Sequence, residues 1–98
     1  MLIGVDTDWY VSAPEFKETY LTSILKNMDV LVFDAIKAVL DGTFEGGTYL
    51  GTLANNGVGI SSYHAFEGAV PADLKAEIEQ AKADLIAGTI TVSGVLGQ

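Results

Sequence analysis

Two carboxylates one residue apart, Asp6 and Asp8, directly follow the short apolar run of residues 2–5. Such a run predicts a buried β-strand, and the carboxyl ends of strands are where α/β sheets bind ligands. Positions two apart on an extended backbone share a face. The pair could bind a metal, perform acid–base chemistry, or accept hydrogen bonds from the vicinal hydroxyls of a sugar. The alternative is that one aspartate caps the following turn while the other is solvated.

A lone lysine, Lys26, ends a second β-prone stretch, residues 22–25, twenty residues after Asp6. Its ammonium group could donate to a carbonyl or ring nitrogen of a ligand, or it could be an ordinary surface lysine. Acidic and basic groups at the ends of short apolar strands indicate a site for a polar small molecule. We therefore predict Asp6, Asp8 and Lys26 as the ligand-binding residues.

Other residues with chemical potential have plainer explanations. Trp9 and Tyr10 could stack on a base or sugar, but packing against a neighbouring short helix is the preferred interpretation for Trp9. His64, the single histidine, lies between Tyr63 and Phe66 without a second histidine or a paired carboxylate nearby, and no nucleophile elbow accompanies it. The glycine-rich residues 55–59 match neither a dinucleotide fingerprint nor a P-loop and predict a tight backbone crossing.

Composition narrows the class of protein. The 98 residues form one domain or part of one, and thirteen acids against five bases give a net charge of −8. Nucleic acids and anionic membrane surfaces need a basic patch, so neither is an expected partner. Because the sequence contains no cysteine, disulfides, thiolate catalysis and cysteine-bound zinc are excluded. We expect no cofactor, no metal and no enzymatic activity.

The predicted elements alternate as in an α/β domain with a largely parallel sheet. Helices are predicted over residues 28–40 and 71–87, because apolar residues recur there at helical spacing and a glycine suited to a helix end follows. A capping box at Ser12 predicts a shorter helix over residues 13–20. Residues 93–98 are expected to be a frayed tail. The predicted strands are residues 2–5, 22–25, 48–53, 58–62 and 89–92.

Several segments together resemble the C-terminal third of the basic membrane protein (BMP) family. Those proteins are bacterial surface lipoproteins that serve as substrate-binding subunits of ABC transporters, typically for purine nucleosides. Each segment is a weak signal alone, but their order is specific and covers nearly the whole chain. The segments are residues 3–8, 21–30, 34–37 with 42–47, 56–60, and 70–72 with the closing amphipathic helix.

The resemblance implies a type I periplasmic-binding-protein fold, in which two α/β lobes hold a nucleoside between them. This chain would supply mainly the C-terminal lobe and a crossover helix. By the same resemblance, Asp6 matches the carboxylate that binds the ribose hydroxyls, and Lys26 matches a lysine in the ligand cleft. Asp8 lies beside them. Trp9 stands where the family more often has a polar residue such as glutamine.

The family proteins are considerably longer, so we expect residues 1–98 to be a single incomplete α/β domain, a C-terminal fragment without the lipoprotein signal. The full-length parent would be extracytoplasmic, anchored to the membrane, and partnered by an ABC permease. In a fragment, the apolar stripe of Val32, Ile36 and Val39 would be exposed, which predicts a homo-oligomer. The alternative is a small oligomeric structural or interaction domain with a vestigial ligand site. An enzyme using Asp6 and Asp8 as acid and base is the third hypothesis.

Overall fold

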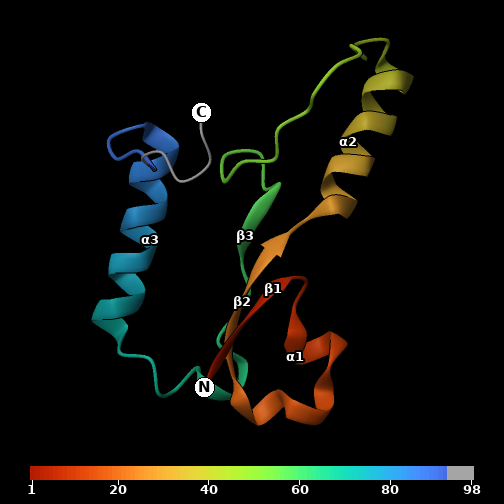
Figure 1. The fold of residues 1–98 in the computed structure, drawn as a ribbon. Coiled ribbons are helices and arrows are strands. Elements are labelled where there is room, and N and C mark those ends of the chain that lie inside the picture. Colours follow the sequence, from red (N-terminus) through yellow and green to blue (C-terminus); the bar gives the residue numbers. More distant parts are fainter. Residues whose placement is uncertain (93–98) are drawn as a thin grey trace. The chain divides into compact units, whose positions relative to one another are not determined.

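The computed structural model of the chain describes residues 1–92, which fall into two compact units. The first runs from Met1 to Gly68 and contains a three-stranded sheet with its connecting helices (Figure 1). The second begins at Ala69 and contains the helix α3 (Ala72–Ala87). The chain is therefore a small α/β protein, as its sequence predicts. Every residue of the candidate site lies in the first unit.

The sheet is mixed rather than largely parallel, so that part of the prediction is wrong. β1 (Leu2–Asp6) pairs in parallel with β2 (Tyr20–Lys26), and β2 pairs antiparallel with β3 (Val58–Ile60). The reason is where the chain returns to the sheet. The amide of Asn27, just beyond the carboxyl end of β2, donates to the carbonyl of Gly57 at 2.9 Å. β3 begins from that end and must therefore run back along β2.

The connection between β1 and β2 consists of two short helices, α1 (Trp9–Ser12) and the 3-10 helix η1 (Pro14–Thr19). Asp8 is the N-cap of α1, and its side chain accepts a hydrogen bond from the amide of Tyr10 at 3.1 Å. The predicted capping box at Ser12 is not formed, because no side chain caps η1. The cap at Asp8 starts the helical segment earlier, so that Ser12 becomes the last residue of α1.

Both long helices are confirmed to within one residue at each end. α2 (Met28–Asp41) ends at Gly42, which has a left-handed backbone with φ 72°. α3 ends in the same way at Gly88, with φ 76°. In each case the glycine amide returns to carbonyls of the last helical turn, which is the usual way that glycine terminates a helix.

Replacing Gly42 by alanine is expected to lower the free energy of unfolding by about 1–2 kcal/mol, because an L-residue at positive φ brings its Cβ against the following carbonyl. Chemical denaturation followed by circular dichroism measures this. The matched control is Gly46→Ala, since no atom lies within 4 Å of the added Cβ and the backbone there is not left-handed. The control should change stability by less than about 0.5 kcal/mol. Equal effects at both positions would contradict the conformational argument.

The predicted strand over residues 48–53 does not form, because the side chain of Asn55 forms hydrogen bonds with backbone groups of this segment. The side-chain oxygen of Asn55 accepts from the amides of Thr52 and Gly57, at 2.8 and 3.0 Å, and its nitrogen donates to the carbonyl of Leu50 at 2.9 Å. Gly51 and Gly57 approach so closely that a Cβ added at Gly51 would lie 3.3 Å from the Gly57 Cα. The expected tight crossing of the backbone is confirmed here.

The predicted last strand, residues 89–92, is also wrong. The amides of Thr89 and Ile90 both donate to the carbonyl of Asp84, at 2.9 and 3.4 Å, so these residues close the end of α3. The expected tail, residues 93–98, lies outside the described residues.

The interior of the first unit is small and largely polar. Among residues 1–92, Tyr20 is the one buried apolar side chain, while Thr22, Ser23 and Ser61 are buried polar residues. Their hydroxyls join the strands beyond the backbone ladder: Thr22 Oγ1 donates to the Ser61 carbonyl at 2.8 Å, and the Ser23 amide donates to Ser61 Oγ at 2.9 Å. Hydrogen bonds, rather than a hydrophobic core, connect these strands.

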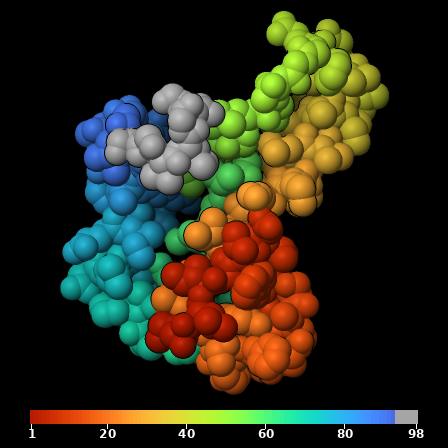
Figure 2. Space-filling model, in the orientation of Figure 1, coloured from red at the N-terminus to blue at the C-terminus, as the bar shows by residue number. Residues whose placement is uncertain are grey.

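Large apolar side chains are instead exposed, and α2 has the most prominent group. Figure 2 shows the side chains of α2, in yellow, at the surface. None of its residues is buried. Neither α2 nor any other helix within residues 1–92 has the length and apolar character needed to span a bilayer. The exposed apolar residues of α2 are Met28, Val32, Phe33, Ile36, Val39 and Leu40.

Candidate functional site

The carboxyl ends of β1 and β2 lie side by side and form one wall of an open hollow of about 520 Å³. Residues 6–8 and 25–29 line it. The three residues predicted from the sequence, Asp6, Asp8 and Lys26, are therefore brought to one place. The parallel pairing explains this, because neighbouring parallel strands end at the same edge of a sheet, where ligands bind in open α/β folds.

An ion pair between Asp6 and Lys26 crosses this hollow. Lys26 Nζ lies 2.8 Å from Asp6 Oδ1, and the two side chains are 64% and 57% exposed. The strand register produces the contact, since Asp6 pairs with Leu25, the residue before Lys26. Exposed ion pairs of this kind contribute at most about 1 kcal/mol to stability. The pair is thus a weak stabilising element, but one that places an acceptor and a donor where a small molecule can reach both.

The backbone of Asp6 is in the left-handed region, with φ 72°. The tight turn that follows is closed by the amide of Thr7, which donates to the carbonyl of Val5 at 2.9 Å. A non-glycine residue in this conformation stores strain, and such strain concentrates at binding and catalytic sites. The turn directs the Asp6 carboxylate toward Lys26 at the end of the neighbouring strand.

Asp8 differs from Asp6 because both of its carboxylate oxygens have protein partners. Oδ1 accepts from the amide of Tyr10, and Oδ2 lies 2.7 Å from Nε2 of His64. Its side chain is 23% exposed. Asp8 therefore caps α1. This agrees with the alternative interpretation of the sequence, in which one of the two aspartates caps the following turn.

Trp9 is a packing residue. Its amide donates to Ser23 Oγ at 3.1 Å, and its indole Nε1 donates to the carbonyl of Val5 at 3.0 Å. Its ring meets Tyr20 edge to face, with centroids 5.8 Å apart. This position agrees with the prediction that Trp9 packs within the protein rather than stacking on a ligand. The residues that it contacts belong to strands, however, and not to the neighbouring short helix.

His64 is the residue near the site that sequence reasoning missed. It opens the 3-10 helix η2 (His64–Phe66), and its backbone is left-handed, with φ 44°. Its contact with Asp8 spans 56 positions of sequence. No local sequence pattern predicts a contact between residues so far apart in the sequence, so the contact became visible only in the folded structure.

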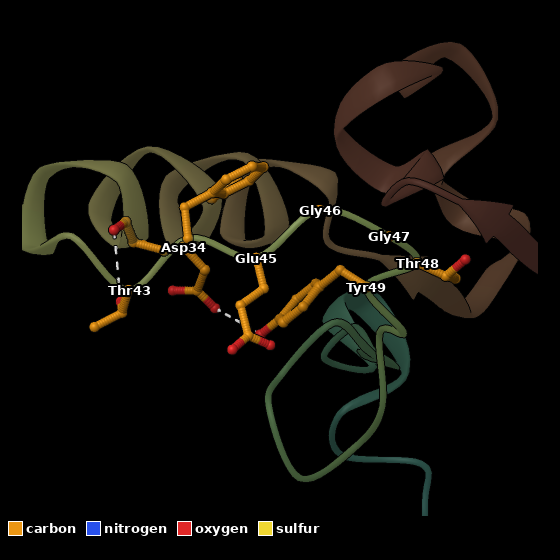
Figure 3. A pocket seen from close by; sticks show the side chains of 10 residues that line it. Asp34, Thr43, Glu45, Gly46, Gly47, Thr48 and Tyr49 are labelled. Atoms are coloured by element: carbon orange, nitrogen blue, oxygen red, sulfur yellow. Dashed lines mark hydrogen bonds between the residues drawn. The ribbon is translucent and has the colours of Figure 1, made fainter.

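A second hollow, of about 370 Å³, lies between α2 and the segment that follows it. Figure 3 shows the phenol of Tyr49 directed at Asp34, to which it donates a hydrogen bond at 3.2 Å. Lys37 and Asp41 pair with each other on the exposed surface of α2. None of the three predicted site residues lies in this second hollow.

Within residues 1–92, no group of three or more histidine, aspartate or glutamate side chains could hold a metal ion. The Asp6–Lys26 hollow remains a candidate site for a polar small molecule because both side chains line it and are exposed. Its chemistry is that of recognition, with one carboxylate and one ammonium group facing solvent together.

Comparisons with known proteins find a likeness among solved structures. No protein-family profile matches the chain, and no curated protein matches it. Among solved structures, it is similar to an ABC transporter solute-binding protein from Aeropyrum pernix K1, with 25% identity and a TM-score of 0.70. The match covers 96% of this chain and 33% of the neighbour. The chain thus resembles about a third of a solute-binding protein.

Proposed function

We propose that this chain is part of the substrate-binding protein of an ABC transporter, and that its substrate is a purine nucleoside. The similarity to a solute-binding protein over 96% of the chain supports the broad class. The resemblance to the basic membrane protein family supports the nucleoside. The observation that carries the proposal is the exposed Asp6–Lys26 pair at two adjacent strand ends.

The chemistry of the pair suits a ribose. The Asp6 carboxylate accepts hydrogen bonds from the two vicinal hydroxyls, because an ionised carboxylate is an acceptor with two oxygens. Lys26 donates to a sugar oxygen or to a carbonyl of the base. Leu25 and Met28 also line the hollow and give it apolar surface for a flat ring. Asp6 and Lys26 are thus the ligand-binding residues, with Asp8 beside them in the same hollow.

The parent protein, on this proposal, is an extracytoplasmic lipoprotein that captures the nucleoside and delivers it to an ABC permease. The chain spans about a third of the neighbour's length, so it supplies one side of the binding cleft. Closure of a second lobe over the ligand would add the remaining contacts. The isolated chain should therefore bind weakly.

The competing function is a small oligomeric structural domain whose ligand site is vestigial. The exposed apolar face of α2 favours some form of association. However, in a vestigial site Asp6 and Lys26 would be expected to lie apart or inside an interface. Their convergence on one open hollow supports the binding function.

Titration of the chain with inosine and with 2′-deoxyinosine tests the proposal, using the amide signals of residues 6–8 and 25–29 in NMR spectra. We expect weak binding of inosine and binding about tenfold or more weaker for the deoxy compound, because a hydrogen bond to a charged group is lost. Asp6→Asn should lower the affinity for inosine by a similar factor.

The matched control is Asp41→Asn, which alters another exposed aspartate–lysine pair, Asp41–Lys37, outside the hollow. Its affinity should equal that of the unchanged chain. Equal affinity for the two nucleosides would contradict the role of Asp6. Sub-micromolar affinity of the isolated chain would contradict the incomplete cleft.

A further inference from the structure

A second cluster of side chains, with His64 at its centre, shares Asp8 with the Asp6–Lys26 hollow. Nε2 of His64 is 2.7 Å from Asp8 Oδ2, and Nδ1 is 3.2 Å from Ser62 Oγ. The imidazole ring stacks on Tyr10, with centroids 4.1 Å apart and an angle of 7° between the planes. The cluster joins the segment after β3 to the turn after β1.

The hydrogen-bond pattern fixes which nitrogen carries the proton when the ring is neutral. The Asp8 carboxylate accepts only, so Nε2 must donate to it. Nδ1 is then the acceptor, and the hydroxyl of Ser62 donates to it. Both ring nitrogens, both oxygens of Asp8 and one face of the ring therefore have partners. A half-buried imidazole held on three sides has little freedom to reorient, since its side chain is 22% exposed.

We propose that His64 is a positioning residue for the ligand site, acting through Asp8 on the turn that carries Asp6. Asp8 is then a support rather than a ligand-binding group, and Asp6 is the carboxylate that meets the substrate. The contact with the ligand rests on the proposed function, whereas the support of the turn does not.

Backbone strain at the two ends of this connection favours the same role. Asp6, with φ 72°, and His64, with φ 44°, both have left-handed backbones. Strained conformations persist only where the surrounding structure holds them in place. The bond between Asp8 and His64 ties the two strained segments together across the carboxyl end of β1. Without it, the Asp6 end of the turn would keep its strand pairing and its ion pair with Lys26, but the Asp8 side chain would keep only the local bond from the Tyr10 amide.

Two substitutions of His64 separate its hydrogen bond from its ring. His64→Phe keeps a ring that can stack on Tyr10 but removes the donor to Asp8. His64→Gln removes the ring but keeps an amide donor near the place of Nε2. If positioning depends on the donor, His64→Phe should shift the amide signals of Thr7 and Tyr10 and weaken inosine binding about tenfold. His64→Gln should restore at least part of both. A purely structural role of the ring predicts the opposite order.

Asp8→Asn is a second way to remove the hydrogen bond between Asp8 and His64. It keeps an oxygen for the Tyr10 amide and removes the charged acceptor for His64. We expect it to reproduce the shifts of His64→Phe, and the double variant to bind inosine no more weakly than either single one. Unchanged amide signals at residues 6–10 in both single variants would overturn the proposal. So would shifted signals with unchanged affinity.

The failure of the nucleoside proposal would look different. In that case the unchanged chain would bind neither inosine nor 2′-deoxyinosine, while His64→Phe and Asp8→Asn would still shift the amides of the turn. The proposal that His64 supports the turn would then be retained, and the proposal that the ligand is a purine nucleoside would be rejected. Asp41→Asn, which leaves the cluster untouched, should cause no shift at residues 6–10 in either case.

Discussion

The purified 98-residue chain is expected to associate into dimers or larger oligomers at concentrations of tens of micromolar. The chain is 49% hydrophobic, yet Tyr20 is the one buried apolar side chain among residues 1–92. On α2, Val32, Ile36 and Val39 are 58%, 57% and 60% exposed and lie on one face at helical spacing. Burying each such side chain fully would contribute about 1.5–3 kcal/mol, and exposed apolar patches of this kind mark interaction surfaces.

Sedimentation velocity measures the association, and two substitutions on α2 locate it. Ile36→Glu introduces a charge into the apolar stripe and should shift the chain toward monomer. Lys37→Gln changes the net charge by the same amount outside the stripe and should leave the oligomer intact. A compact, folded monomer of the unchanged chain at these concentrations would contradict the prediction. Dissociation by both variants would mean that charge, rather than the apolar face, controls assembly.

Local sequence signals were sufficient for the two long helices. Their apolar spacing and the glycines at 42 and 88 are properties of neighbouring residues, and the structure has both helices ending at those glycines. The meeting of Asp6 and Lys26 could also be predicted, because it needs only two adjacent parallel strands whose ends carry these side chains. What the sequence predicts well is therefore what depends on periodicity and on strand ends.

The misses have two physical causes: local hydrogen bonds that compete with a predicted strand, and long-range contacts that are set by the topology of the chain. The strand predicted over residues 48–53 lost its backbone partners to the side chain of Asn55. The direction of β3 follows from the hydrogen bond between the amide of Asn27 and the carbonyl of Gly57. These two residues are thirty positions apart in the sequence. The contact between His64 and Asp8 depends in turn on where β3 ends. Such features follow from topology, which β propensity alone does not fix.

Gly4→Ala is expected to lower the free energy of unfolding by about 3 kcal/mol, near the upper end of the usual cost of overpacking. A Cβ at this position would lie 2.5 Å from Ser23 Oγ and 2.6 Å from the Trp9 ring. Neither neighbour can yield freely. Ser23 is fully buried, and its hydroxyl accepts from the Trp9 amide. The Trp9 ring is held by Tyr20 and by its bond to the Val5 carbonyl.

Chemical denaturation of Gly4→Ala beside Gly59→Ala measures the effect. Gly59 lies in the same sheet, opposite Leu25, and an added Cβ there meets no atom within 4 Å. The control should therefore stay within about 0.5 kcal/mol of the unchanged chain. A similar stability of the two variants would mean that the packing of Trp9 on Gly4 contributes little.

The same substitution also probes how the site is attached to the sheet. Trp9 follows Asp8 directly and begins α1, so a displaced indole would move the cap of that helix and the turn that starts at Asp6. We therefore expect Gly4→Ala to shift the amide signals of Thr7 and Tyr10 under native conditions, as His64→Phe does. The two variants act through different elements, one through the sheet and one through η2. Agreement between them would show that the position of Asp6 depends on contacts with both elements.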